Sequence, residues 1–116
     1  MKKPFSLDFS FSPADVAAVL ASLPLTSYVP TNAAVRHANA VLCESAAEKL
    51  SSGSSAITPN EFRMVALSVA IARDVLSGSP DWEVSEEDRR AISPHFFTLN
   101  RLAAQFDPIL DRLLYT

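Results

Sequence analysis

The sequence predicts a mainly α-helical protein, a compact bundle of four to five helices preceded by a short N-terminal β-strand. Apolar residues recur every three to four positions over most of the chain, whereas the first dozen residues alternate between apolar and polar. Prolines that follow Ser, Thr or Asp mark the starts of helices. At 116 residues the chain has the size of one domain, with a strand or arm over 1–12 and a helical body over 13–116.

The N-terminal strand is predicted from this strict alternation. Phe5, Leu7, Phe9 and Phe11 alternate with small polar residues, so all four side chains would lie on one face of a strand. The backbone N–H and C=O groups of such a strand need partners. The predicted strand has two possible pairing partners. One is residues 25–29 of the same chain, which also have a strand pattern, and the other is the same segment of a second copy.

The first helix is predicted over 13–23. Ser12, Pro13 and Asp15 supply a cap, a first helical residue and an acid in the first turn. A connection through this helix would join the two strands in parallel, and about a dozen residues is near the minimum for that connection. Two strands alone leave open edges, which favours pairing with another chain.

A long helix is predicted over 32–51, ending at the serines around Gly53. One face is apolar and is expected to pack on the core, while the opposite face is polar and is expected to be exposed to solvent. The apolar face consists of Val35, Ala38, Leu42, Ala46 and Leu50. On the polar side, His37 and Glu44 lie about 10 Å apart along the helix, which is too far for one metal ion.

The helix predicted over 59–77 has no polar side. At 100° per residue it carries two apolar stripes on nearly opposite sides, so it must be covered on both. The first stripe is Phe62, Val65, Ala66, Val69, Ala72 and Leu76, and the second is Met64, Leu67, Ile71 and Val75. We predict that the second stripe lies at a homodimer interface. The alternative is that helices 32–51 and 94–115 of the same chain cover both stripes.

A short helix is predicted over 86–92, because Ser85 is a suitable cap and acids fill the first turn. Trp82 lies just before this helix. Since Trp is common at binding hot spots, Trp82 is a candidate contact residue, and the alternative is that it covers the core of its own domain.

The last two helices are predicted over 94–106 and 108–115. Their apolar residues keep one helical phase across Pro108, so a single kinked helix is the alternative. This phase includes Phe96, Leu99, Ala103, Phe106, Leu110 and Leu114.

The composition argues against nucleic-acid and membrane partners. The formal net charge is −3, and no cluster of basic residues could bind phosphates. No apolar run approaches the length of a membrane span. Asp8 and Asp15 interrupt the segment after Lys2 and Lys3, so we expect no secretory signal. A single cysteine cannot form an internal disulfide, and these features together predict a cytoplasmic protein.

Arg73 and His95 are the candidate residues for a ligand pocket. Arg73 falls in the phase of an apolar stripe, where it could anchor a carboxylate or, in a structural role, bond the last carbonyls of its helix. His95 falls at the second position of a helix, where the dipole favours the neutral ring. No catalytic, cofactor or metal motif accompanies them, so we expect no catalytic residue, cofactor or metal.

The predicted function is therefore a non-enzymatic protein–protein interaction or adaptor module that acts as a homodimer. Another protein could also join by strand addition or by helix packing. The alternative is a small-molecule binder or enzyme with a pocket between helices that uses Arg73 or His95.

Overall fold

Side-chain caps fix where four of the helices begin. In the computed structural model, which describes residues 9–54 and 56–114, each cap accepts a hydrogen bond from the backbone N–H of the third helical residue. The caps are Ser12, Asn32, Thr58 and Ser85, and they start α1 (Pro13–Ser22), α2 (Ala33–Ser51), α3 (Pro59–Leu76) and α4 (Glu86–Ile92). The sequence predicts all four helices, with ends that differ by at most one residue.

The two helices predicted at the end of the chain are a single helix. α5 (Phe96–Leu114) continues through Pro108 and follows a 3₁₀ turn, η2 (Ser93–His95). Pro108 has no N–H to bond the carbonyl of Ala104, and both residues are exposed, so water can bond that carbonyl. The break predicted at residue 107 is wrong. The alternative of a single helix, which rests on the continuous helical phase of the apolar residues, agrees with the structure.

The strand predicted over 25–29 is also wrong. Residues Leu23–Tyr28 continue from α1 as a 3₁₀ helix, η1. The hydroxyl of Thr26 donates a hydrogen bond to the carbonyl of Leu23 at 2.9 Å, and the hydroxyl of Ser27 donates one to the carbonyl of Pro24 at 2.8 Å. These local bonds stabilise a helical turn, where an extended chain would need bonds to a neighbouring strand.

No strand is present in the described part of the chain, and the first half of the predicted N-terminal strand lies outside it. The segment 9–12, which we define as the arm, is irregular. Phe9 and Phe11 are half-buried, with ring centroids 5.4 and 6.1 Å from that of Phe106, whereas Ser10 is exposed. The alternation thus predicts correctly that Phe9 and Phe11 face the core. In the structure these rings pack against Phe106, and no neighbouring described strand pairs with the segment.

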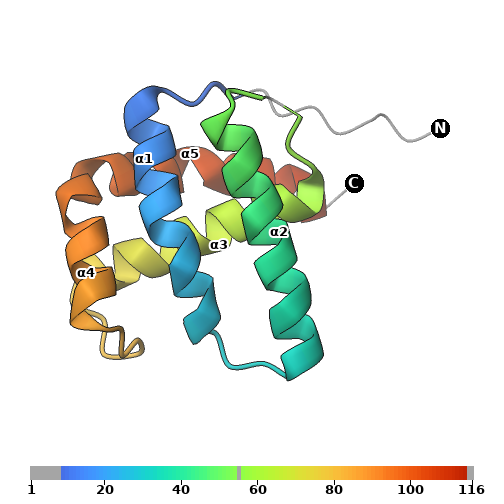
Figure 1. Ribbon diagram of the computed structural model, residues 1–116. Helices are drawn as coiled ribbons and strands as arrows, with labels where there is room; N and C mark the ends of the chain where they lie inside the picture. The colour runs from blue at the N-terminus through green and yellow to red at the C-terminus, as the bar shows by residue number, and fades with distance from the viewer. Residues whose placement is uncertain (1–8, 55, 115–116) are drawn as a thin grey trace.

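α3 lies at the centre of the fold. It contacts α1, α2, α4, α5 and η1, and Figure 1 shows α1 and α2 crossing in front of it, with α5 running beside it. Nine of its 18 residues are buried, and seven of the nine belong to the two predicted stripes. The chain itself therefore covers most of both stripes, and η1 and α1 contact α3 in addition to the two helices of the alternative interpretation.

Candidate interaction surfaces

The predicted interface stripe on α3 lies partly inside the chain. Ile71 and Val75 are 2% and 1% exposed, so they belong to the core. The physical reason is that η1 and α4 contact α3, as α1, α2 and α5 also do, so the chain itself covers this end of the stripe. Met64 and Leu67 are half-buried, so another chain could reach the stripe at this end.

The aromatic candidates of the sequence pack on their own chain. Phe9, Phe11 and Trp82 are partly buried against the hydrophobic core. For Trp82 this is the alternative role, that of covering the domain. Phe5 and Leu7 lie outside the described residues.

Arg73 and His95 lie in different elements, near the end of α3 and in η2, and both are half-buried. The Arg73 guanidinium lies 3.9 Å from the carboxylate of the adjacent Asp74. Neither Arg73 nor His95 lines either of the two hollows described below. A ligand pocket built on these residues stays a prediction.

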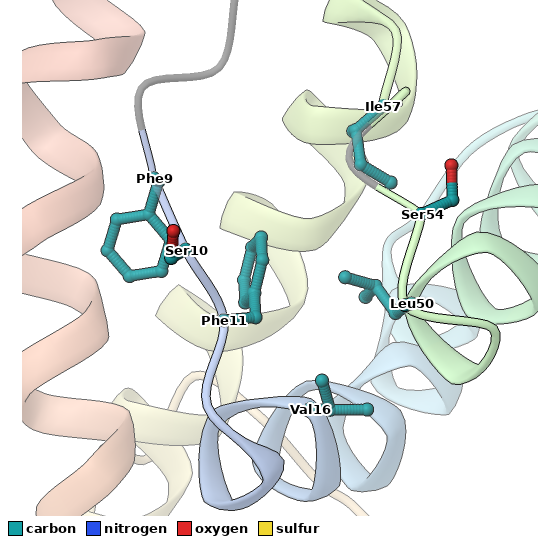
Figure 2. Close-up of a pocket in the computed structure, with 8 residues that line it drawn as sticks. Phe9, Ser10, Phe11, Val16, Leu50, Ser54 and Ile57 are labelled. Atoms are coloured by element: carbon teal, nitrogen blue, oxygen red, sulfur yellow. The ribbon is translucent and has the colours of Figure 1, made fainter.

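A groove lies between the arm, the start of α1 and the turn that joins α2 to α3 (Figure 2). We define it as the arm groove; its volume is about 220 Å³. Among the described residues that line it, none has a charged side chain, and the hydroxyls of Ser10 and Ser54 are the polar side-chain groups. The lining residues are Phe9, Ser10, Phe11, Val16, Leu50, Gly53, Ser54 and Ile57.

A second hollow, between η1 and α2, has a volume of about 50 Å³. This is space for one or two water molecules and not for a larger ligand. Its lining residues are Thr26, Ser27, Thr31, Arg36, Asn39 and Ala40.

The backbone of the arm is unpaired within the described residues. Ser12 is extended, with φ −74° and ψ 164°, and its N–H donates to the carboxylate of Asp15 at 3.0 Å. No backbone hydrogen bond joins Phe9, Ser10 or Phe11 to another described residue. Within the part of the chain that the structure describes, the N–H and C=O groups of these three residues therefore have no backbone partner.

The N-terminal half of α2 projects beyond the helices that pack against it (Figure 1). The buried side chains of α2 are Ala46 and Leu50, toward its C-terminal end. Val35 is 43% exposed and Ala38 is exposed too, so the prediction that the whole apolar face packs on the core is wrong. With 19 residues α2 is about 28 Å long, and because it crosses α3, only part of that length rests on the body. We define residues 33–42 as the α2 overhang.

The outer face of α2 combines one apolar residue with separated charges. Val41 is 51% exposed and lies on the side of the helix opposite Ala46. His37 lies one turn before Val41, and Glu44 lies one turn after it on the same face. All three side chains are exposed, so the face carries an imidazole toward its N-terminal end and a carboxylate toward its C-terminal end.

Phe96 and Phe97 form an exposed aromatic pair at the start of α5. They are 38% and 85% exposed, and their ring centroids are 5.4 Å apart in an edge-to-face arrangement. Phe97 is not among the residues that the sequence pattern predicts to form a contact. A usable signal was present, because adjacent helical residues lie 100° apart and two aromatic rings at such positions cannot both face one core.

Glu61 is a buried carboxylate that joins α3 to α2. It accepts hydrogen bonds from Lys49 Nζ at 2.7 Å, from the Thr58 N–H at 2.8 Å and from the Ser45 hydroxyl. Burial by itself raises the pKa of Glu61, but the hydrogen bonds from Lys49, Ser45 and Thr58 outweigh burial and bring the pKa down to about 2. Glu61 is therefore ionised at neutral pH and has a structural role instead of that of a catalytic base.

Asp15 joins α1 to α5 in the same way. It pairs with Arg101, 86 residues later in the chain. Burial raises the pKa of Asp15, but the N–H of Ser12 and the Arg101 guanidinium outweigh burial, and the pKa lies below its ordinary value. The sequence predicts Asp15 and Glu61 as members of helix caps. It does not predict Arg101 or Lys49 as their partners, because spacing along the chain carries no sign of contacts between helices.

Within the described residues, no group of three His, Cys, Asp or Glu side chains is placed to hold a metal ion. No helix in this part of the chain is both long enough and apolar enough to cross a membrane. No protein-family model, no curated protein and no solved structure matches the chain. The case for a function therefore rests on the surfaces described above.

Proposed function

We propose that the chain is a non-enzymatic protein–protein interaction or adaptor module that works as a homodimer through the outer side of α2. The observation that carries the proposal is the outer face of α2, where Val41 is 51% exposed next to exposed alanines. Exposed apolar surface that the chain itself does not cover is typical of a contact with another chain. A second helix is the partner that an exposed helical face fits best.

The spacing of His37 and Glu44 on either side of Val41 favours a second copy of α2 as that helix. If two copies of α2 pack antiparallel about a two-fold axis near Val41, His37 of each copy faces Glu44 of the other. Parallel packing would instead place Glu44 against Glu44. An imidazole can hydrogen-bond a carboxylate, so these contacts set the orientation, while burial of Val41 and the neighbouring alanines supplies the attraction.

The proposed interface is small, and we expect weak association. A contact of this kind lies at the low end of specific interfaces, below about 1,200 Å² in total, so the dimer should have a dissociation constant in the micromolar range. Light scattering after size exclusion, over a series of concentrations, should therefore show a mass rising from that of the 12.6 kDa chain to twice that value.

Val41→Glu is expected to weaken the dimer about tenfold or more, because two new carboxylates would meet near the two-fold axis. Ala104→Glu is the matched control, since Ala104 is an exposed apolar residue on the solvent-facing side of α5. Both variants should keep the helical circular dichroism spectrum of the parent. A chain that stays monomeric at millimolar concentration, or a dimer that Val41→Glu leaves unchanged, contradicts the proposal.

A further inference from the structure

We propose that two copies of α2 bind zinc between them, with His37 of one copy and both Glu44 and Glu48 of the other as ligands. The inference rests on the proposed homodimer and deepens it, because it names a metal ion that would control assembly. The two-fold axis would create two identical sites, and a single chain contains neither of them in full.

The outer face of α2 has the spacing of a seam between two helices. Its residues follow one another at alternating steps of three and four positions, the pattern that keeps one stripe facing a second helix over several turns. The residues of this seam are Ala34, His37, Val41, Glu44 and Glu48, and all of them are exposed. An imidazole and two carboxylates in such a seam need polar partners once two helices pack.

A single chain leaves these polar side chains without a common partner. Within residues 9–54 and 56–114, no hydrogen bond or ion pair involves the side chain of His37, Glu44 or Glu48. Glu44 and Glu48 lie one turn apart on the same face, so both carboxylates can reach one ion. His37 lies about 10 Å before Glu44 along the axis, so one chain offers two ligands and not three.

Antiparallel packing supplies the third ligand. Along the axis, Glu44 and Glu48 lie about 4.5 and 10.5 Å after Val41, and His37 lies about 6 Å before it. If the two-fold axis passes near Val41, His37 of the second copy therefore falls between the levels of the two carboxylates. Ala34 of that copy then faces Glu48, and its small side chain leaves room for the ligand.

One imidazole and two carboxylates are a suitable donor set for zinc. Zn²⁺ binds His nitrogen and Glu oxygen at about 2.0–2.2 Å, and three protein ligands leave its fourth position to water. Mg²⁺ and Ca²⁺ prefer oxygen ligands alone, so the imidazole selects against them. The ion also offsets the repulsion between the two carboxylates, and it bonds to both copies, so its binding favours the dimer over separate chains.

The test is light scattering after size exclusion of the full-length chain in EDTA, in Zn²⁺ and in Mg²⁺. With zinc at ten times the dissociation constant of each of the two sites, the dissociation constant of the dimer should fall roughly a hundredfold. Mg²⁺ should leave it within about twofold of its value in EDTA.

The outcomes separate the metal site from the homodimer. A dimer that forms in EDTA and is unchanged by zinc overturns the metal site and leaves the homodimer standing. A chain that is monomeric in EDTA and dimeric in zinc supports the metal site and overturns apolar burial as the source of association. A chain that stays monomeric in both overturns both proposals.

Complementary variants show whether the ligands come from two copies. His37→Gln removes the imidazole, and Glu44→Gln with Glu48→Gln removes the carboxylates, so each variant alone should lose its response to zinc. A mixed dimer of the two regains one complete site, and zinc should tighten it roughly tenfold, measured by fluorescence anisotropy of one labelled variant titrated with the other. No tightening of the mixed dimer would contradict a site shared between copies.

Cys43→Ser and His95→Gln are the matched controls, because these residues are the only thiol and the other imidazole of the chain. Cys43 lies on the opposite side of α2 from Val41. Both variants should keep the response to zinc within about twofold of the parent. If either variant loses it, or if zinc associates all variants alike, the metal is an adventitious ion only and the proposal is overturned.

Discussion

Glu61→Gln is expected to lower the free energy of unfolding at pH 7 by about 2–3 kcal/mol. The Glu61 side chain is 3% exposed and accepts charge-assisted hydrogen bonds that a neutral amide cannot replace in kind. The substitution also leaves the Lys49 ammonium without its carboxylate, 2.7 Å away. Urea denaturation of parent and variant at pH 7 measures the difference. Glu44→Gln is the control, because Glu44 is exposed, and it should change stability by less than about 0.5 kcal/mol.

The same carboxylate should make the protein sensitive to acid. The pKa of Glu61 falls from an ordinary 4.5 to about 2 in the folded protein, so its stabilising effect is complete above about pH 5. The effect is lost as the pH falls toward 2, because the unfolded chain then binds a proton that the folded chain excludes. At 1.36 kcal/mol per pKa unit, the loss is about 3 kcal/mol. Glu61→Gln should flatten this part of the pH profile, and an equal slope in parent and variant would contradict the assignment.

Phe106→Ala is expected to cost about 3–5 kcal/mol of stability, a large share of the total for a small domain. Phe106 is 1% exposed, and its ring lies 5.1 Å from Phe62 and 5.4 Å from Phe9, measured between centroids. The substitution therefore leaves a cavity where the arm meets the core. Phe97→Ala, at a ring that is 85% exposed, should change stability by less than about 0.5 kcal/mol. Similar losses for the two variants in urea denaturation would contradict the packing described here.

The helix starts could be predicted because their causes are local. Ser12 and Thr58 each precede Pro, and an acid follows three residues after each cap, so a few adjacent residues contain the whole capping arrangement. Thr26 and Ser27 show the opposite case. Their residue types suit a strand, yet the hydroxyls bond carbonyls three residues back and stabilise a 3₁₀ turn.

The candidate surfaces could be predicted only in part, because they depend on how helices cross. The pattern of α2 shows which face is apolar, but not that Val35 extends beyond the body while Ala46 is covered. For the arm, the period of two predicts that Phe9 and Phe11 face the same way, but not whether a strand or an aromatic ring receives them. Contacts between segments that are distant in the chain depend on the tertiary structure, and the spacing of residues in the sequence does not predict them.

The ion pair between Asp15 and Arg101 has a consequence for how the protein is made. Its members are 86 residues apart, and the arm also packs on Phe106, so α1 and the arm lack their partners until α5 has been synthesised. Helices emerge from the ribosome in chain order, at about 5–20 residues per second. During those seconds the rings of Phe9 and Phe11 are open to chaperones and to other nascent chains. We therefore expect the native core to close only after α5 has emerged from the ribosome.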